Sequence, residues 1–156
     1  MSDYLLLVFG VLLVLGTGLF VASEFAIINV DKVDLESRKA DGEKGLELPI
    51  KAVSTTATQL SSAQLGITLT TLLTGFVAEP ALSRLLTPWL SSLGLDSSTI
   101  SALAVVLAMT IATVASFLIG ELVPKNMALS APRKVLKLVA AFQLASRLFL
   151  NPSSFF

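Results

Sequence analysis

The chain has 156 residues, of which 54% are hydrophobic and 14% charged, and its mean hydropathy of +0.83 is far higher than a soluble domain needs to fill one core. Its 11 basic and 11 acidic residues give a formal net charge of zero, so no basic field attracts nucleic acid. The absence of Cys and His excludes disulfides, Cys/His zinc sites and the Ser-His-Asp and Cys-His catalytic sets, and we expect a lipid-embedded protein that is not an enzyme.

The first apolar segment, residues 4–30, predicts a membrane-spanning helix. At 1.5 Å per residue, a helix over residues 4–29 reaches roughly 39 Å, enough to cross a hydrocarbon core of about 30 Å with some tilt. Asp3 but no basic residue precedes the segment, which is longer than a signal-peptide core, so we expect it to remain as a span. Ser23 and Glu24 interrupt its apolar sequence near its end.

A polar segment and a second span follow. Residues 31–51 are mostly polar, and we expect helical structure there on the membrane surface, interrupted by Asp41-Gly42 and Gly45. The second span is predicted over residues 53–86. Its middle carries hydroxyl side chains, which include Thr68, Thr70, Thr71 and Thr74.

The third span is predicted over residues 99–123 and carries small side chains at four-residue intervals. They are Ala104, Ala108, Ala112, Ser116 and Gly120. Such a series permits close helix packing within the chain or between two chains, and three helices alone enclose little polar volume, so we expect a homodimer. Pro132 then begins a basic amphipathic helix over residues 132–150, which we expect in the membrane interface or packed under the bundle.

The basic residues predict the orientation, because Lys and Arg that flank spans stay on the cytoplasmic side. Ten of the 11 lie in the first loop or after the third span, namely Lys32, Arg38, Lys39, Lys44, Lys51, Lys125, Arg133, Lys134, Lys137 and Arg147. We therefore expect a multi-pass protein of the cell inner (plasma) membrane, with the N-terminus outside and the C-terminus cytoplasmic. Arg84 lies on the outer side near Glu79 and Pro80, and we interpret Glu79 as part of the structure of that end.

Two carboxylates, Glu24 and Glu121, fall inside predicted spans, where each costs about 2.5–3.5 kcal/mol on insertion scales and needs a polar partner or a function. Pro124 has no N–H, so a continuous α-helix would leave the carbonyl of Gly120 without its hydrogen bond. A carbonyl beside a carboxylate suits Mg²⁺, a hard cation that prefers oxygen ligands, whereas Zn²⁺ or Cu⁺ would favour the absent His or Cys. Ser23 and the threonines of the second span could complete such a site with hydroxyls.

Each of these residues also has a purely structural interpretation. The Ser23 hydroxyl could donate to the carbonyl of Leu19 in its own helix, and the threonines could hold helices together. Glu121 could form an ion pair with Lys125, four residues later, while Glu24 could reach the interface or pair with a basic residue. The residues alone leave these alternatives open.

Two motifs resemble those of a known family. The segment Gly18–Ala26 (GLFVASEFA) resembles the first-helix segment of the CNNM/CorC transmembrane domain, and Gly120–Lys125 (GELVPK) resembles its Gly-Glu-hydrophobic-hydrophobic-Pro-Lys motif. The second helix departs from the Gly-Asn-Asn of many members. Its segment Gln64–Thr71 (QLGITLTT) is similar to the hemolysin C-like branch.

The resemblance implies an all-α, dimeric magnesium transporter domain with three spans and a juxtamembrane helical belt. It matches Ser23, Gly120 and Glu121 to the family's Mg²⁺ ligands, and the hydroxyl of Thr70, with Thr71 as second choice, replaces the missing amide. Further candidates for contact with the ion, directly or through the surrounding groups, are Glu24, Thr68, Thr71, Ser116 and Lys125. Cytosolic CBS and CorC-type domains usually follow such a domain, and any nucleotide binding would belong to them.

Two functions agree with this resemblance. The first is Mg²⁺ transport by alternating exposure of the intramembrane site to the two sides. The second is a non-transporting membrane anchor and Mg²⁺ sensor that controls cytosolic regulatory domains. Loss of flux in a folded Glu121→Ala variant would favour transport, whereas unchanged flux would contradict it.

Overall fold

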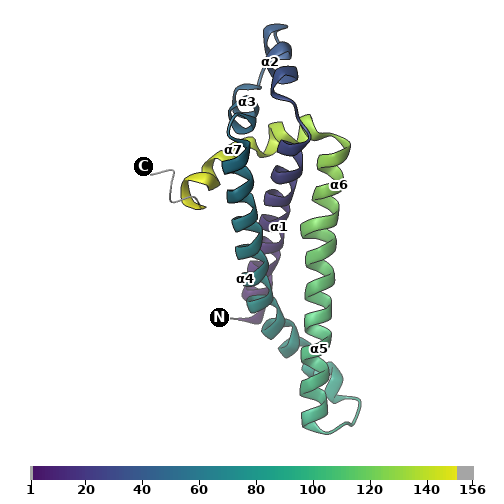
Figure 1. The fold of residues 1–156 in the computed structure, drawn as a ribbon. Helices are drawn as coiled ribbons and strands as arrows, with labels where there is room; N and C mark the ends of the chain where they lie inside the picture. Colours follow the sequence, from purple (N-terminus) through teal and green to yellow (C-terminus); the bar gives the residue numbers. More distant parts are fainter. Residues whose placement is uncertain (1, 151–156) are drawn as a thin grey trace.

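The chain is helical and contains no strand within residues 2–150, the part that the structure, a computed structural model, describes (Figure 1). In chain order the elements are α1 (Asp3–Ile28), α2 (Lys32–Ala40), α3 (Glu47–Val53), α4 (Thr56–Ser91), α5 (Ser97–Ala115), the π-helix η1 (Ser116–Leu122), α6 (Val123–Ser130) and α7 (Pro132–Leu150). Among the described residues, three helices are long and apolar enough to cross a membrane: α1, α4 and the continuous third rod, Ser97–Ser130, which joins α5, η1 and α6. The predicted all-α fold with three spans is confirmed.

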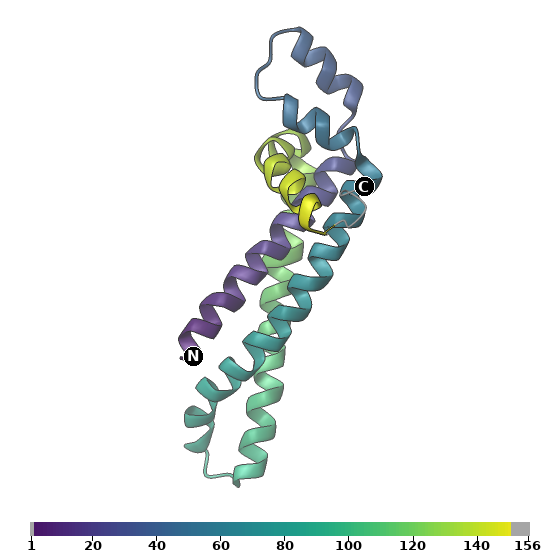
Figure 2. The same ribbon diagram turned by 90° about the vertical axis from the view of Figure 1, so that its left-hand side faces the viewer.

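The connection between α4 and α5 forms one end of the bundle, called here the hairpin end (residues 92–96; Figures 1 and 2). α1 packs along α4, and it meets the third rod at η1 and α6. Gly94 lies in this connection with a φ of +70°, a backbone conformation that residues with a side chain rarely adopt. Asp96 caps α5 by accepting hydrogen bonds from the Ser98 hydroxyl and from the N–H of Thr99, and these bonds hold the pKa of its carboxyl below the usual value.

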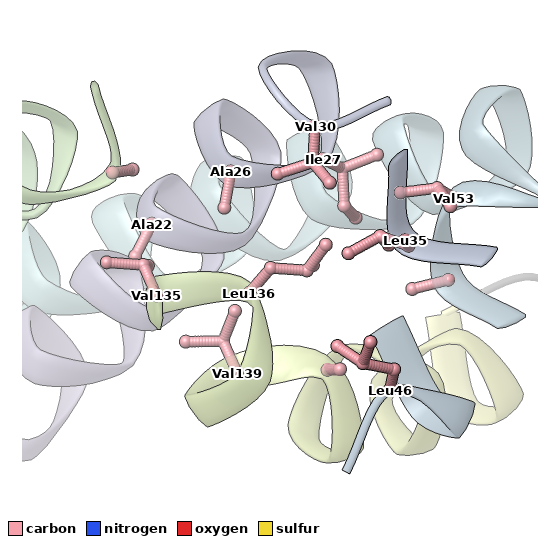
Figure 3. Close-up of a cluster of buried hydrophobic side chains, with 13 residues drawn as sticks. Ala22, Ala26, Ile27, Val30, Leu35, Leu46, Val53, Val135, Leu136 and Val139 are labelled. Carbon is pink, nitrogen blue, oxygen red and sulfur yellow. The ribbon is translucent and has the colours of Figure 1, made fainter. Parts of the chain in front are cut away.

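The opposite end, called here the belt end, consists of α2, α3 and α7 around the ends of α1 and α4 (Figures 1 and 2). Its hydrophobic cluster contains Leu35, Leu46 and Leu136, each at most 1% exposed. Figure 3 shows these side chains converging from α1, α2, the segment before α3 and α7, together with Ala22, Ala26, Ile27, Val30, Val53, Val135 and Val139. The helix α7 therefore buries part of its apolar surface within the chain, through Val135, Leu136 and Val139, while Leu138 and Phe149 stay exposed.

Ion pairs also attach α7 to the first loop. Arg133 lies 3.5 Å from a carboxylate oxygen of Asp34, and the Lys137 ammonium contacts the carboxylate of Glu43. The hydrogen bond from Lys137 lowers the pKa of Glu43 below its usual value. The belt end is thus held by both apolar packing and charge pairing.

α1 and α4 approach each other closely at Gly66. A Cβ added to Gly66 would lie 2.5 Å from the ring of Phe20, so a larger residue must displace that ring. The Phe20 ring in turn contacts the ring of Phe142 on α7, with 4.9 Å between the centroids. One aromatic side chain of α1 therefore touches both the second span and the belt end.

The third rod differs from the predicted span of 99–123, because it stays helical as far as Ser130. The irregularity next to Pro124 is the π-helix η1 and not a break, and the N–H of Val123 donates to the carbonyl of Leu118, five residues earlier. Pro124 falls in the first turn of α6, where its missing N–H is tolerated. α4 likewise extends beyond the predicted residue 86, to Ser91.

Candidate functional site

A groove of about 1220 Å³ lies between α1, α4 and the third rod, and it is called the groove below. Three carboxylates line it: Glu24, Glu79 and Glu121. Five hydroxyl side chains line it as well: Thr17, Thr71, Thr74, Thr113 and Ser116. Apolar side chains such as Val21, Phe76 and Met109 complete its walls. The three apolar spans therefore enclose a partly polar cavity.

Helical periodicity brings these side chains to the groove. Thr17 and Glu24 on α1 are seven residues apart, and Thr71 and Glu79 on α4 are eight apart, so each pair shares one helix face. α4 runs antiparallel to α1 and to the third rod. Glu79 consequently lies toward the hairpin end of the groove, while Glu24 and Glu121 lie toward its belt end.

Glu24 and Glu121 come from different spans and have few partners. The carboxylate of Glu24 accepts a long hydrogen bond of 3.4 Å from Nε2 of Gln64. Glu121 is exposed and makes no ion pair or side-chain hydrogen bond with residues 2–150. The ion pair of Glu121 with Lys125 is not formed, because the Lys125 ammonium lies over the ring of Phe25, 4.8 Å from its centroid. Lys125 therefore leaves the Glu121 carboxylate unneutralised.

Two predicted hydroxyl ligands, Ser23 and Thr70, are engaged within the helices. Ser23 is fully buried and donates to the carbonyl of Leu19 at 2.7 Å, and it does not line the groove. Thr70 donates to a carbonyl of its own helix at 2.8 Å, and its oxygen lies 2.7 Å from that of Thr17, which joins α4 to α1. Thr68 is exposed and donates within α4. Thr17 was missed by sequence reasoning, although it lies on the same face as Glu24.

Gly120 allows η1 to approach α1. It is buried, and a Cβ added there would lie 3.3 Å from the carbonyl oxygen of Val14. On the facing helix, a Cβ added to Gly18 would lie 3.0 Å from the ring of Pro124 and 3.8 Å from the carbonyl oxygen of Gly120. The two glycine-containing motifs therefore pack against each other, which brings the Gly120 carbonyl next to α1.

Three hydroxyls of the groove have no hydrogen-bond partner among residues 2–150. In the middle of the spans most hydroxyls donate to the carbonyl four residues earlier, as Thr74 does at 2.7 Å and Thr110 at 2.8 Å. Thr71, Thr113 and Ser116 make no side-chain hydrogen bond with any part of the chain that the structure describes, and all three line the groove. Sequence reasoning missed Thr113, although its position three residues before Ser116 places it on the same face.

The carboxylates of the groove are spread along it. Within residues 2–150 no group of three or more Asp, Glu, His or Cys side chains is close enough to hold a metal ion. A cation in the groove would therefore have at most two of these carboxylates and would take its other ligands from hydroxyls, carbonyls and water. Mg²⁺ fits such a set because it commonly keeps several waters beside one or two carboxylates.

The small residues of the third rod divide into two groups. Ala104 and Ala108 are fully buried, and the helix that α5 contacts along its length is α4. Ala112 lines the groove together with Ser116. Ala104 and Ala108 therefore serve packing within the chain, as Gly120 does against α1, whereas Ala112 and Ser116 keep the groove open.

The fold and the groove define an integral membrane domain with three spans, a helical belt at one end and oxygen-rich side chains inside the membrane. The family model described as "CNNM: Cyclin M transmembrane N-terminal domain" matches residues 8–156. The chain belongs to this CNNM/CorC family. The resemblance predicted from the motifs of the first and third spans is confirmed.

Bacterial proteins of the same kind are similar over most of the chain. The UPF0053 protein MT1890 of Mycobacterium tuberculosis is 36% identical over 138 residues, which cover 88% of this chain and 30% of that protein. The UPF0053 protein YhdT of Bacillus subtilis is 37% identical over 135 residues, which cover 86% of this chain and 29% of that protein. The chain thus spans less than a third of the length of these two relatives.

Proposed function

We propose that this domain binds Mg²⁺ in the groove and passes it across the membrane by exposing the bound ion first to one side and then to the other. The observation that carries this proposal is that Glu24 of α1 and Glu121 of η1 line one groove inside three apolar spans. Carboxylates at such positions are costly, and a hard cation that accepts oxygen ligands offsets that cost. Membership of the CNNM/CorC family supports the same function.

The proposed ligands are the Glu121 carboxylate, which lines the groove, and three oxygens from the packed helices beside it, namely the Gly120 carbonyl and the hydroxyls of Ser23 and Thr70, which do not line the groove in this structure. A hydroxyl that donates to a carbonyl keeps lone pairs for a cation, so the hydrogen bonds of Ser23 and Thr70 do not prevent ligation. The groups that would contact waters kept by the ion are those that line the groove nearby, namely Glu24, Thr71 and Ser116. Thr68 and Lys125 point to other partners and would act only indirectly.

We further propose that the belt end faces the cytoplasm of a cell inner membrane. All basic residues except Arg84 lie in the first loop, at the start of α6 or in α7, which places ten of the 11 at the belt end. A second copy of the chain would cover the open side of the groove, where apolar side chains such as Phe76 and Phe117 are exposed. The proposed functional unit is therefore a homodimer in a lipid bilayer.

The first test is Mg²⁺ titration of the purified chain in detergent by calorimetry. We expect saturable binding in the wild type, loss of the stronger binding phase in Glu121→Gln and weakening of that phase in Ser23→Ala. Glu36→Gln is the matched control, because Glu36 is an exposed carboxylate of α2 that pairs with Lys32 outside the spans. A folded wild type that does not bind Mg²⁺ would contradict the proposal.

Flux separates transport from sensing. In liposomes loaded with a fluorescent Mg²⁺ indicator, we expect the wild type and Glu36→Gln to carry Mg²⁺ and Glu121→Gln to carry none. Binding that depends on Glu121 without any flux would favour the membrane anchor and Mg²⁺ sensor instead. Native mass spectrometry of the same samples tests the dimer.

A further inference from the structure

Glu79 is a third carboxylate of the groove, and the proposed ligand set does not use it. It lies on the same face of α4 as Thr71, eight residues away, which corresponds to a rise of roughly 12 Å along the helix. Because α4 runs antiparallel to the third rod, Glu79 is near the hairpin end and Glu121 is near the belt end. The two carboxylates thus mark opposite parts of one continuous groove.

The basic residue nearest to Glu79 in the sequence, Arg84, has another partner. The Arg84 guanidinium lies 2.9 Å from the carboxylate of Asp3 at the start of α1. The other carboxylate near this end, Asp96, is used to cap α5. Glu79 itself makes no ion pair or side-chain hydrogen bond with residues 2–150, although it is only partly exposed. Its carboxylate is therefore not used to hold residues 2–150 together.

A second oxygen is available on the same part of α4. Pro80 is inside α4 and has no N–H, so the carbonyl of Phe76, four residues earlier, lacks its α-helical donor. Phe76, Glu79 and Pro80 all line the groove. A carboxylate and a carbonyl without its usual donor are both hard oxygen ligands of the kind that divalent cations prefer.

Hydroxyls without protein partners connect the two parts of the groove. Thr71, Thr113 and Ser116 line it between Glu79 and Glu121, and they make no side-chain hydrogen bond within the described part of the chain. In an apolar span a hydroxyl normally donates to its own helix, so three exceptions on one groove indicate that another group contacts them.

We propose that Glu79 captures a divalent cation at the hairpin end of the groove, and that the cation then moves past Thr71, Thr113 and Ser116 to Glu121. The movement rests on the proposed transport function, whereas capture at Glu79 does not. The ligand is the free aqueous cation, and Glu79 with the Phe76 carbonyl replaces part of its water shell.

Flux in liposomes tests the route. We expect Glu79→Gln to raise the Mg²⁺ concentration for half-maximal flux about tenfold when the ion is supplied at the hairpin side, which corresponds to about 1.4 kcal/mol of lost binding. Glu79→Asp should restore part of the affinity, and Glu36→Gln should match the wild type. Thr113→Val should lower the maximal flux. An unchanged half-maximal concentration in folded Glu79→Gln would overturn the route.

Mn²⁺ binding tests the capture site separately from transport. By electron paramagnetic resonance in detergent, Glu121→Gln should keep a weak Mn²⁺ site that disappears when Glu79→Gln is added. If that weak site persists in the double variant, Glu79 is not the capture group. If it disappears while the wild type carries no flux, the transport function fails and the Glu79 site stands. Intact binding at Glu121 in the single Glu79→Gln variant excludes general misfolding.

Discussion

At the belt end, Leu46 and Leu136 are almost completely buried and charged side chains are paired between elements, as Arg133 is with Asp34. In the groove, carboxylates and hydroxyls such as Glu121 and Thr113 make neither ion pairs nor side-chain hydrogen bonds with residues 2–150. The belt end therefore concentrates interactions that stabilise the fold, and the groove keeps oxygen atoms available for a ligand. This difference implies that substitutions at the two places should change different measured quantities.

The largest expected effect is on the stability of the belt end. Leu136→Ala should lower the free energy of unfolding by about 2–5 kcal/mol, because it leaves a cavity in the hydrophobic cluster. Thermal unfolding in detergent measures the loss. Leu138→Ala on the same helix is the control, since Leu138 is 78% exposed, and its effect should be within about 0.5 kcal/mol. A loss in Leu136→Ala as small as the one expected for Leu138→Ala would show that this cluster does not support the fold.

A smaller effect is expected where the spans pack against each other. Gly66→Ala should destabilise by about 1–3 kcal/mol, because the new methyl group must displace the ring of Phe20. Gly75→Ala faces the groove, where no atom lies within 4 Å of the added Cβ. It should be neutral or stabilising by up to about 1 kcal/mol through helix propensity. A destabilising Gly75→Ala would contradict the open groove.

Thr70 on α4 and Thr113 on α5 allow a hydroxyl with a hydrogen bond to another span to be compared with a hydroxyl that has none within residues 2–150. Without Mg²⁺, Thr70→Val should lower stability by about 1 kcal/mol, because it removes the contact with Thr17. Thr113→Val should change stability by less than about 0.5 kcal/mol, since its hydroxyl has no partner within residues 2–150. Chemical denaturation of both variants gives the comparison, and a larger loss for Thr113→Val would reverse it.

The smallest effect concerns pH at the belt end. The hydrogen bond from Lys137 lowers the pKa of Glu43 in the folded chain, so the ionised carboxylate contributes stability above its usual pKa. That contribution is lost as the pH falls through the lowered pKa. The melting temperature should therefore decrease less steeply between about pH 6 and pH 3 in Glu43→Gln than in the wild type. Asp41→Asn, at a carboxylate without an ion pair in the described residues, should retain the wild-type slope.

Long apolar segments and isolated charges are local features, so the sequence was sufficient to predict three spans and to select Glu24 and Glu121. Which side chains meet depends on how the helices pack. Arg84 is close to Glu79 in the sequence, yet it pairs with Asp3, because the start of α1 lies beside α4. The structure was needed to place Glu79 in the groove.

The hydroxyls illustrate the same limit. Thr70 was selected as a ligand through the family resemblance, as the replacement for the missing amide, but only the packed helices reveal its contact with Thr17. Thr113 is a single threonine in an apolar helix and has no local signature. That its hydroxyl has no hydrogen-bond partner within residues 2–150 can be known only from the positions of the neighbouring carbonyl groups in the folded chain.

The π-helix η1 also fixes the rotational phase between the two halves of the third rod. An α-helix turns about 100° per residue, and a π-helical segment behaves like an α-helix with one residue inserted. Thr113 lines the groove before this segment, and Ala128 is buried in the hydrophobic cluster of the belt end after it. A deletion of one residue between them would rotate one half by about 100° relative to the other. The rod could then no longer line the groove and pack into the hydrophobic cluster of the belt end at the same time. The length of this short segment is therefore as constrained as its composition.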